Sequence, residues 1–159
     1  MIDDIDTKIL NILQRDGRTT NADLARHVGL APSAVLERVR KLEERGVLRG
    51  YTALVDQAAI GFGLLAFILV RSSDPTGTDH VARQIAKAPE VLEVHNVAGE
   101  DCFVVKVRAR DTKDLSRILK KRFGAIKAIR STRTIIVLDT IKESTVLPVA
   151  IPSGESDDG

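Results

Sequence analysis

Two short helical patterns separated by a tight turn occupy residues 20–46, and this stretch constrains the fold of the chain more than any other. Gly29 can adopt the left-handed conformation in which many helices end, and Pro32 suits the first turn of the helix that follows. Apolar residues recur three or four positions apart in both patterns, as on the buried side of a helix. They are Leu24, Ala25 and Val28 in the first pattern, and Val35, Val39 and Leu42 in the second. This layout predicts a helix-turn-helix, whose second helix can lie in the major groove of DNA.

Capping residues mark where the helices begin. Thr20 is a predicted N-cap, and Asp23, three residues later, resembles the second member of a capping box. Asp3 and Asp6 repeat this pattern at the start of an earlier helix, which its apolar spacing extends over residues 3–16. The three predicted helices together form one small N-terminal domain.

Composition indicates a globular protein without membrane or secretory features. The 159 residues are 43% hydrophobic, which is enough for one domain or for two small domains with separate cores. Cys102 is the single cysteine, so no disulfide forms within the chain. The longest apolar run, residues 64–70, is far shorter than the roughly 20 residues of a membrane span. The acidic start of the chain differs from a signal peptide, and we expect a cytoplasmic location without membrane association.

Strand and helix patterns alternate in the rest of the chain. Strands are predicted at residues 64–71, 91–97, 102–109 and 132–141, and helices at residues 79–88 and 113–122. The order βαββαβ predicts an α+β chain with a ferredoxin-like domain, an antiparallel sheet with both helices on one face. A further strand is expected at residues 50–55. The predicted parts are a helix-turn-helix domain at residues 1–50, a strand and linker at 51–63, the ferredoxin-like domain at 64–148 and a disordered tail at 149–159.

Two of the predicted strands carry apolar residues on both faces. A sheet with helices on one face alone is expected to alternate apolar and polar residues. Residues 64–70 and 135–138 do not alternate, so their second face needs a cover. We expect that cover to be the same face of a second copy, in a two-fold homodimer. The alternatives are that the fold is misassigned or that the N-terminal domain supplies the cover.

The second helix of the predicted helix-turn-helix carries a basic stripe beside its buried side. Arg38, Lys41 and Arg45 are expected to meet phosphates, Ser33, Ala34 and Glu37 to approach base edges, and Thr19, Thr20 and Asn21 to offer donors to a phosphate. One helix-turn-helix meets few phosphates, so we expect the dimer to bind a pseudo-palindromic duplex with strong salt dependence. The simpler interpretation is a solvated helix face with ion pairs such as Glu37–Lys41.

Three stretches of the chain carry a resemblance to a known family. The first is DDIDTKILNILQRDGRTTNADLARHVGLAPSAVLERVRKLEERGVLRGYTALVD. The pattern continues through Gly61 and Gly63 to APEVLEVHNVAGEDCFVVKVRARD, and it ends with STRTIIVLDTIKESTVLP. Over about residues 2–148 the chain resembles the Lrp/AsnC, or feast/famine, transcriptional regulators.

The resemblance implies a DNA-binding regulator and a sensor in one chain. Members of the family bind DNA as dimers that often assemble further, commonly into octamer-like rings. Their C-terminal domain, often called RAM, usually senses an amino acid or a related metabolite at an interface between dimers, and no cofactor is implied. The effector region centres on the turn after the second strand of the sheet. The implied effector residues are Val97, Gly99, Glu100, Asp101, Cys102, Thr132 and Thr134.

Two positions depart from the pattern of the family. Many members begin the second helix of the motif with serine, where this chain has Ala31, which cannot cap a helix. Members also often carry Gly-x-x-Asp in the effector turn, whereas Cys102 stands third after Gly99 and the carboxylate comes one residue early, at Asp101. Adjacent strand residues point to opposite faces, so Asp101 is expected to point elsewhere unless the turn bulges. A plain hairpin turn is the alternative interpretation of this segment.

Two other functions fit parts of the sequence. Proteins that resemble this family in both domains include a haem-pathway decarboxylase, whose candidate residues here would be His95, Asp101 and Cys102. The histidines share no metal-ligand spacing and no nucleophile–base pair is evident, so we expect neither a metal nor enzyme activity. The other alternative is an architectural protein that wraps DNA. Its basic track would comprise Lys120, Lys121, Arg122, Lys127, Arg130 and Arg133. A solvated helix end is the simpler explanation of that track.

Overall fold

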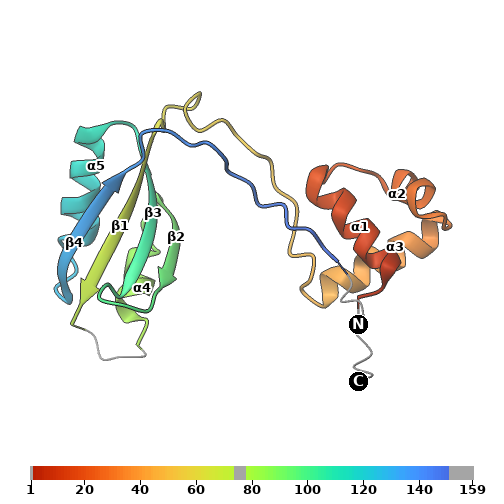
Figure 1. Ribbon diagram of the computed structural model, residues 1–159, viewed down its shortest axis with the longest axis horizontal. Helices are drawn as coiled ribbons and strands as arrows, with labels where there is room; N and C mark the ends of the chain where they lie inside the picture. The colour runs from red at the N-terminus through yellow and green to blue at the C-terminus, as the bar shows by residue number, and fades with distance from the viewer. Residues whose placement is uncertain (1, 74–77, 151–159) are drawn as a thin grey trace, which may run out of the picture. The chain divides into compact units, whose positions relative to one another are not determined.

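The computed structural model describes residues 2–73 and 78–150, which form two compact units (Figure 1). The N-terminal unit contains residues 2–54 together with residues 142–150, and the C-terminal unit contains the described residues between 55 and 141. The sequence placed a domain boundary at residue 148 instead. The difference arises because Asn11 and Gln14 form hydrogen bonds with the backbone close to that residue. Most of the predicted disordered tail lies outside the described residues.

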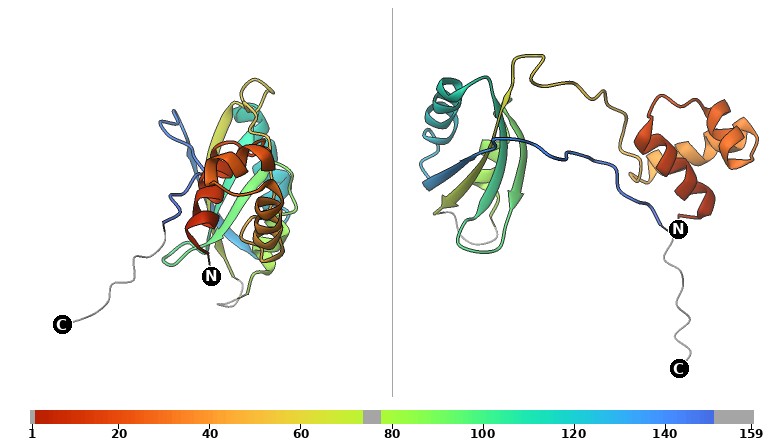
Figure 2. Two further views of the ribbon diagram at one scale, coloured as in Figure 1. Left: turned by 90° about the vertical axis from the view of Figure 1, so that its right-hand side faces the viewer. Right: turned by 45° about the horizontal axis from the view of Figure 1, so that its top comes forward.

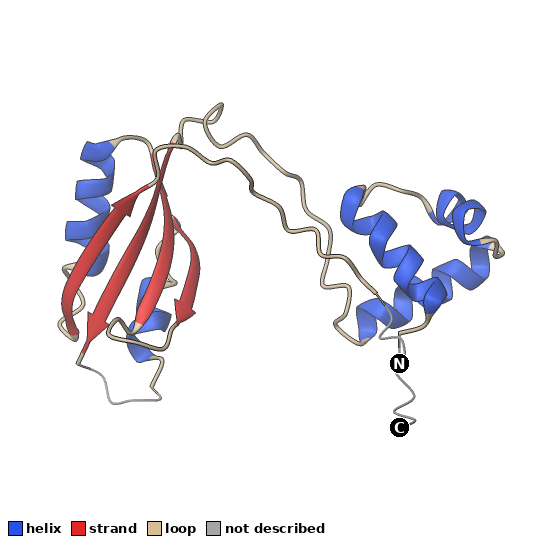
Figure 3. Cartoon of the chain, viewed as in Figure 1, coloured by secondary structure: helices blue, strands red, loops and turns tan. Residues whose placement is uncertain are grey.

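The N-terminal unit is built from α1 (Asp4–Arg15), α2 (Asn21–Val28) and α3 (Pro32–Glu44) (Figure 3). The apolar sides of these helices meet in an aliphatic core, and removal of that surface from water holds the helices together. Its buried members are Ile9, Leu10, Leu13, Leu24, Ala25, Val35, Val39 and Leu42. The helix-turn-helix prediction is confirmed.

The helix ends follow the predicted capping. Asp3 accepts a hydrogen bond from the backbone N–H of Asp6 at 2.8 Å, and the two residues form a capping box at the start of α1. Thr20 Oγ1 accepts from the backbone N–H of Asp23 at 3.1 Å at the start of α2. Gly29 ends α2 with φ of 72°, a conformation that a side chain would disfavour. Ala31 gives α3 no side-chain cap, as expected.

The C-terminal unit is an antiparallel sheet with helices on one face. Its strands are β1 (Leu64–Ser72), β2 (Val91–Asn96), β3 (Phe103–Ala109) and β4 (Ile129–Ile136), in the spatial order β2-β3-β1-β4. Its helices α4 (His80–Ile85) and α5 (Thr112–Ile118) pack against the strands in a single core (Figure 2). That core buries Val81, Ile85, Leu115 and Ile118 against Ala66, Ile68, Val70, Phe103, Val105 and Val107. The predicted ferredoxin-like fold is confirmed.

The last strand begins and ends earlier than predicted. β4 covers residues 129–136 instead of 132–141. The final backbone hydrogen bond runs from the N–H of Val137 to the C=O of Leu65, at the start of β1. Beyond that point no described strand pairs with residues 138–141, and Leu138 and Ile141 are 97% and 90% exposed. Apolar content alone overestimated the length of this strand.

The strand predicted at residues 50–55 is absent from this described part of the chain. A strand needs partners for its backbone N–H and C=O groups, and the sheet of the protein does not include this segment. Gly50 has φ of 146°, which departs from extended geometry. Tyr51 instead donates its hydroxyl hydrogen to Glu43 Oε1 of α3 at 3.1 Å, so the segment packs against the N-terminal unit.

The helix predicted at residues 113–122 changes its winding near its end. After Ile118 the chain continues into a wider π-helical segment, η1 (Leu119–Phe123). This segment brings Phe123 into the core, where the residue is 2% exposed. The next residue is Gly124, and a Cβ there would lie 2.7 Å from the backbone oxygen of Lys120. A side chain at this position therefore collides with backbone and cannot be relieved by a rotamer change.

We expect Gly124→Ala to destabilise the C-terminal unit by about 1–3 kcal/mol, the usual cost of overpacking. Urea unfolding of the full chain, followed by circular dichroism, measures the loss. Gly63→Ala is the matched control, because a Cβ at Gly63 meets nothing within 4 Å and the φ of Gly63 is not positive. Equal stability of the two variants would contradict this account of the turn.

Candidate DNA-binding surface and effector turn

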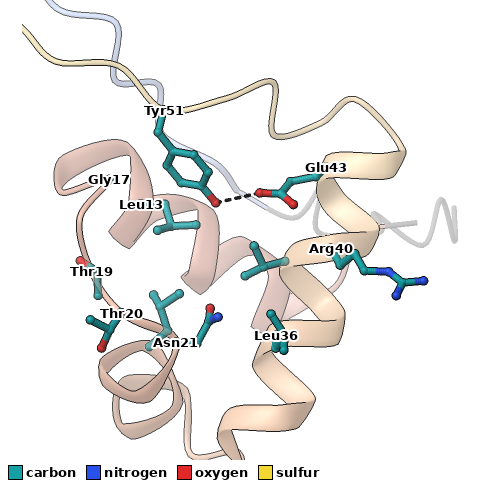
Figure 4. A pocket seen from close by; sticks show the side chains of 11 residues that line it. Leu13, Gly17, Thr19, Thr20, Asn21, Leu36, Arg40, Glu43 and Tyr51 are labelled. Carbon is teal, nitrogen blue, oxygen red and sulfur yellow. Dashed lines mark hydrogen bonds between the residues drawn. The ribbon is translucent and has the colours of Figure 1, made fainter.

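A hollow of about 630 Å³ lies between the start of α2 and the exposed side of α3 (Figure 4). One wall consists of Thr19, Thr20 and Asn21, three of the residues predicted to contact DNA. The opposite wall belongs to α3 and contains Leu36, Arg40 and Glu43, with Tyr51 beside them. The predicted phosphate donors therefore share a concave surface with the helix that was predicted to enter the groove.

The start of α2 offers mainly its backbone to a ligand. The hydroxyl of Thr20 already accepts from the backbone of Asp23 and donates to the carboxylate of Asp23 at 2.6 Å. The bond from Thr20, with that from Arg26, lowers the pKa of Asp23. Thr19 donates to the backbone oxygen of Asp16 at 2.9 Å. The positive end of the helix dipole remains as the attraction for a phosphate.

Arg38, predicted to meet a phosphate, turns toward α1. Its Nη1 lies 2.6 Å from Asp3 Oδ2 and 2.8 Å from Asp6 Oδ1. The pKa of the Asp3 carboxyl is lowered, first by the N–H of Asp6 and then by the guanidinium of Arg38. The same two carboxylates raise the pKa of Arg38. Arg38 therefore ties α3 to α1, and its charge is largely balanced within the protein.

The remaining predicted residues of α3 lie on its solvent side. Ser33, Ala34 and Glu37 are exposed near the start of the helix. Lys41 pairs with Glu37 at 3.6 Å, the ion pair that the simpler interpretation of this face predicted. Arg45, also exposed, is the C-cap residue of α3. The Glu37–Lys41 pair is exposed, and exposed ion pairs of this kind are weak, so it does not prevent either side chain from contacting DNA.

Leu36 and Arg40 are candidate contact residues that the sequence reasoning missed. Arg40 pairs with Glu44 at 2.9 Å on the exposed side, and Leu36 is 54% exposed although it is large and apolar. Both lie on the flank of α3 that shares the hollow with the start of α2. The sequence contained one signal for this role: Leu36 is a large apolar residue outside the apolar stripe that marks the buried side of α3. The sequence did not show on which flank of α3 the start of α2 would lie.

The predicted effector turn closes a hairpin between β2 and β3. The backbone N–H of Val97 donates to the C=O of Cys102 at 3.1 Å, and Gly99 has φ of 127°. The N–H of Cys102 donates to the C=O of Val70 at 2.8 Å, which holds the turn against the end of β1. Gly99 is thus required by the conformation of the turn, which is also what a plain hairpin would need.

Two arginines face the carboxylates of the turn. Arg71 of β1 lies 2.5 Å from Glu100 Oε2 and 3.6 Å from Asp101 Oδ1. Arg133 of β4 lies 3.1 Å from Asp101 Oδ2. The side chain of Asp101 is 19% exposed, whereas that of Glu100 is 88% exposed. The displaced carboxylate thus bridges β1 and β4, and Glu100 forms the outer, more easily exchanged pair.

Thr132 and Thr134 lie apart from these charges. They pair with Val70 and Ile68, two residues of the helix-covered face of the sheet. Arg133 between them pairs with Leu69 and points to the other face. Thr132 lines a separate hollow of about 360 Å³ beside η1. A single copy of the chain therefore places the predicted effector residues on two faces of the sheet.

The residues considered for an enzyme or an architectural protein occupy ordinary structural positions. His95 contacts Glu93 at 3.1 Å on the exposed sheet surface. Among the described residues no group of three or more His, Cys, Asp or Glu could hold a metal ion. Arg122 of the proposed basic track pairs with Glu90 at 3.2 Å. Within residues 2–73 and 78–150, no helix is long and apolar enough to cross a membrane.

Known proteins match both units. The AsnC-type helix-turn-helix domain matches residues 2–43, and the Lrp/AsnC ligand binding domain matches residues 65–147. The chain is 41% identical over 148 residues to the HTH-type transcriptional regulator FL11 of Pyrococcus horikoshii, covering 93% of this chain and 97% of that protein. It is 35% identical over 150 residues to the leucine-responsive regulatory protein of Escherichia coli, covering 93% and 92%.

A solved structure extends the comparison to a bound small molecule. The feast or famine regulatory protein from M. tuberculosis, complexed with L-methionine, superimposes with a TM-score of 0.86 at 35% identity. The match covers 94% of this chain and 100% of that chain. The likeness thus spans both units of the chain.

Proposed function

The chain belongs to the Lrp/AsnC family of DNA-binding transcriptional regulators, and on that premise we propose which of its surfaces read DNA and sense a small molecule. The family is one of regulators and not of enzymes, so the decarboxylase alternative is set aside. The cytoplasmic location expected from the sequence stays a prediction.

The proposed DNA-binding surface consists of the start of α2 and the exposed side of α3. The observation that carries it is the shared hollow, in which Thr19, Thr20 and Asn21 face Leu36 and Arg40. A recognition helix lies in the major groove while the preceding helix contacts the backbone, so residues on both walls can meet one duplex. Arg40 supplies a cation there, whereas Arg38 is held by α1. Ser33, Ala34, Glu37, Lys41 and Arg45 complete the proposed contact set.

We expect Arg40→Ala to weaken DNA binding and to reduce the slope of log affinity against log salt by about one, since one phosphate contact is lost. Fluorescence anisotropy at several salt concentrations measures both quantities, with duplexes selected from random sequence by the wild-type protein. Lys8→Ala on the exposed side of α1 removes the same charge elsewhere and should leave the slope unchanged. Equal slopes for wild type and Arg40→Ala would sink the proposed surface.

A two-fold homodimer is the proposed binding unit, with a pseudo-palindromic duplex as its target. The outer face of the sheet, opposite α4 and α5, carries Phe67 and Leu69 of β1, Val104 of β3 and Ile135 of β4. Ile135 is 48% exposed in the single chain. A second copy packed on this face would remove these apolar groups from water, and a dimer would supply two recognition helices. Further assembly to an octamer is the expectation that the family supports.

Ile135→Glu should shift the protein from the two-copy species toward single chains, because a carboxylate would be buried between the sheets. Sedimentation velocity over a range of concentrations measures the change. Leu138→Glu makes the same substitution at a residue that is 97% exposed and lies beyond β4, and it should have no effect. A wild-type protein that sediments as a single chain at all concentrations would contradict the dimer.

The proposed effector site lies at the turn from Val97 to Cys102. It is supported by the match to the Lrp/AsnC ligand binding domain and by the L-methionine complex of the M. tuberculosis relative. Arg71 could receive the carboxylate of an amino acid if Glu100 gave up its pair, whereas Arg133 is paired with Asp101. Because Thr132 and Thr134 lie on the other face, they would take part only if a neighbouring copy brought its turn to them.

L-Methionine and the other standard amino acids, added singly at rising concentration, should include at least one that raises the unfolding temperature of the protein. Binding to the native state adds about 2.7 kcal/mol at a ligand concentration 100 times the dissociation constant. Asp101→Asn should reduce this gain, because its arginine partners would reorient. Asp139→Asn, an exposed residue beyond the end of β4, is the control. No shift with any amino acid would remove the main support for sensing at this turn.

A further inference from the structure

The last described residues of the chain are held by side chains of α1. Gln14 Nε2 donates to the backbone oxygen of Leu147 at 2.9 Å, and the N–H of Leu147 donates to Gln14 Oε1 at 2.8 Å. Asn11 repeats this arrangement with Val149, at 3.1 Å and 3.3 Å. Each carboxamide thus satisfies both backbone groups of one residue. Figure 1 shows the segment returning to α1.

The spacing of these residues matches that of an extended peptide. Asn11 and Gln14 are three positions apart, so they lie on one face of α1. Leu147 and Val149 are two positions apart, and alternate residues of an extended chain present their N–H and C=O groups to the same side. A carboxamide has one oxygen acceptor and an amino donor group, the same pair that a neighbouring strand would offer.

The sequence of the segment prepares it for this contact. Pro148 occupies the intervening position, where its missing N–H removes no hydrogen bond to α1. Proline also restricts Leu147 before it to extended backbone, which lowers the entropy lost on docking. The side chain of Val149 packs against the aliphatic core of the N-terminal unit, whereas that of Leu147 is 70% exposed. Backbone recognition and one apolar contact therefore hold the segment.

We propose that Asn11 and Gln14 form a docking site for an extended peptide, that residues 147–149 of the same chain occupy it, and that this latch restricts how freely the helix-turn-helix moves. The N-terminal unit is connected to the ligand-binding domain at residues 54–55 and again at residues 141–142. A unit attached once samples many orientations, and a second attachment removes many of them.

The latch would couple the two proposed activities of the regulator, effector sensing by the C-terminal unit and DNA binding by the N-terminal unit. β4, which carries Thr132 and Thr134, continues through residues 137–146 into the latched residues 147–149. A change at β4 therefore reaches α1 along continuous backbone. This role rests on the proposed DNA binding by a dimer, in which restricted helix-turn-helix units favour one distance between half-sites.

The first test measures docking in the full-length protein by hydrogen exchange. In Asn11→Ala/Gln14→Ala, the amides of Leu147 and Val149 should exchange at least about tenfold faster than in wild type, because their acceptors are gone. Leu147→Ala keeps the backbone bonds and loses only an exposed side chain, so it should exchange as wild type. Unchanged protection in the double variant would overturn the docking site.

The second test measures DNA affinity for duplexes that carry two half-sites, selected with the wild-type protein, at their preferred distance and with about five extra base pairs, half a helical turn. Wild type should lose about tenfold or more in affinity on the lengthened duplex, and the double variant about threefold or less. A chain ending at Lys142, which lacks the segment and keeps α1 intact, should match the double variant and carries the test if that variant unfolds.

The outcomes separate the latch from the proposed function. Wild-type discrimination retained in both altered proteins would overturn the role of the latch. A wild-type protein that binds neither duplex would overturn the proposed DNA binding, and hydrogen exchange would still decide the docking site.

Discussion

Burial of Val35, Val39 and Leu42 fixes the rotation of α3 about its axis, and the exposed chemistry of the N-terminal unit follows from that rotation. With these residues in the core, one flank of α3 faces α1 and the other faces the start of α2. Arg38 lies on the first flank and Arg40 on the second. Two arginines that are two residues apart in one helix therefore have different roles, one structural and one open to a phosphate.

The sequence predicted what depends on local rules. Capping at Asp3 and Thr20, the turn at Gly29 and the inward residues of each helix all follow from spacing within one segment. It did not predict features that depend on a partner distant in sequence. The length of β4 is set by where β1 begins, the packing of Tyr51 by Glu43, and the engagement of Arg38 by Asp3 and Asp6.

The residues of the candidate sites also divide into those suggested by local sequence and those that depend on a partner distant in sequence. The candidate residues at the start of α2 and along α3 could be proposed from residue type, because donors and cations on a helix-turn-helix have few uses. Leu36 and Arg40 were missed because the flank that meets α2 is a property of helix packing. At the turn, strand alternation predicted that the early carboxylate would point elsewhere. Its arginine partners, Arg71 of β1 and Arg133 of β4, are 30 and 32 residues away from it in sequence.

The placement of the cations affects how such a protein can bind specific DNA sites and also respond to a small molecule. Arg38 and Arg122 have carboxylate partners that lie far from them in the chain, so their charges help to maintain the fold. The cations that remain for DNA lie mostly on α3 in pairs between neighbouring turns, which exchange readily for phosphate. With few phosphate contacts on each unit, the DNA affinity of the proposed dimer depends on holding its two helix-turn-helix units at a fixed distance. The proposed latch joins α1 to the peptide backbone of residues 147–149, so it would restrict that distance without altering any group that is proposed to contact the duplex.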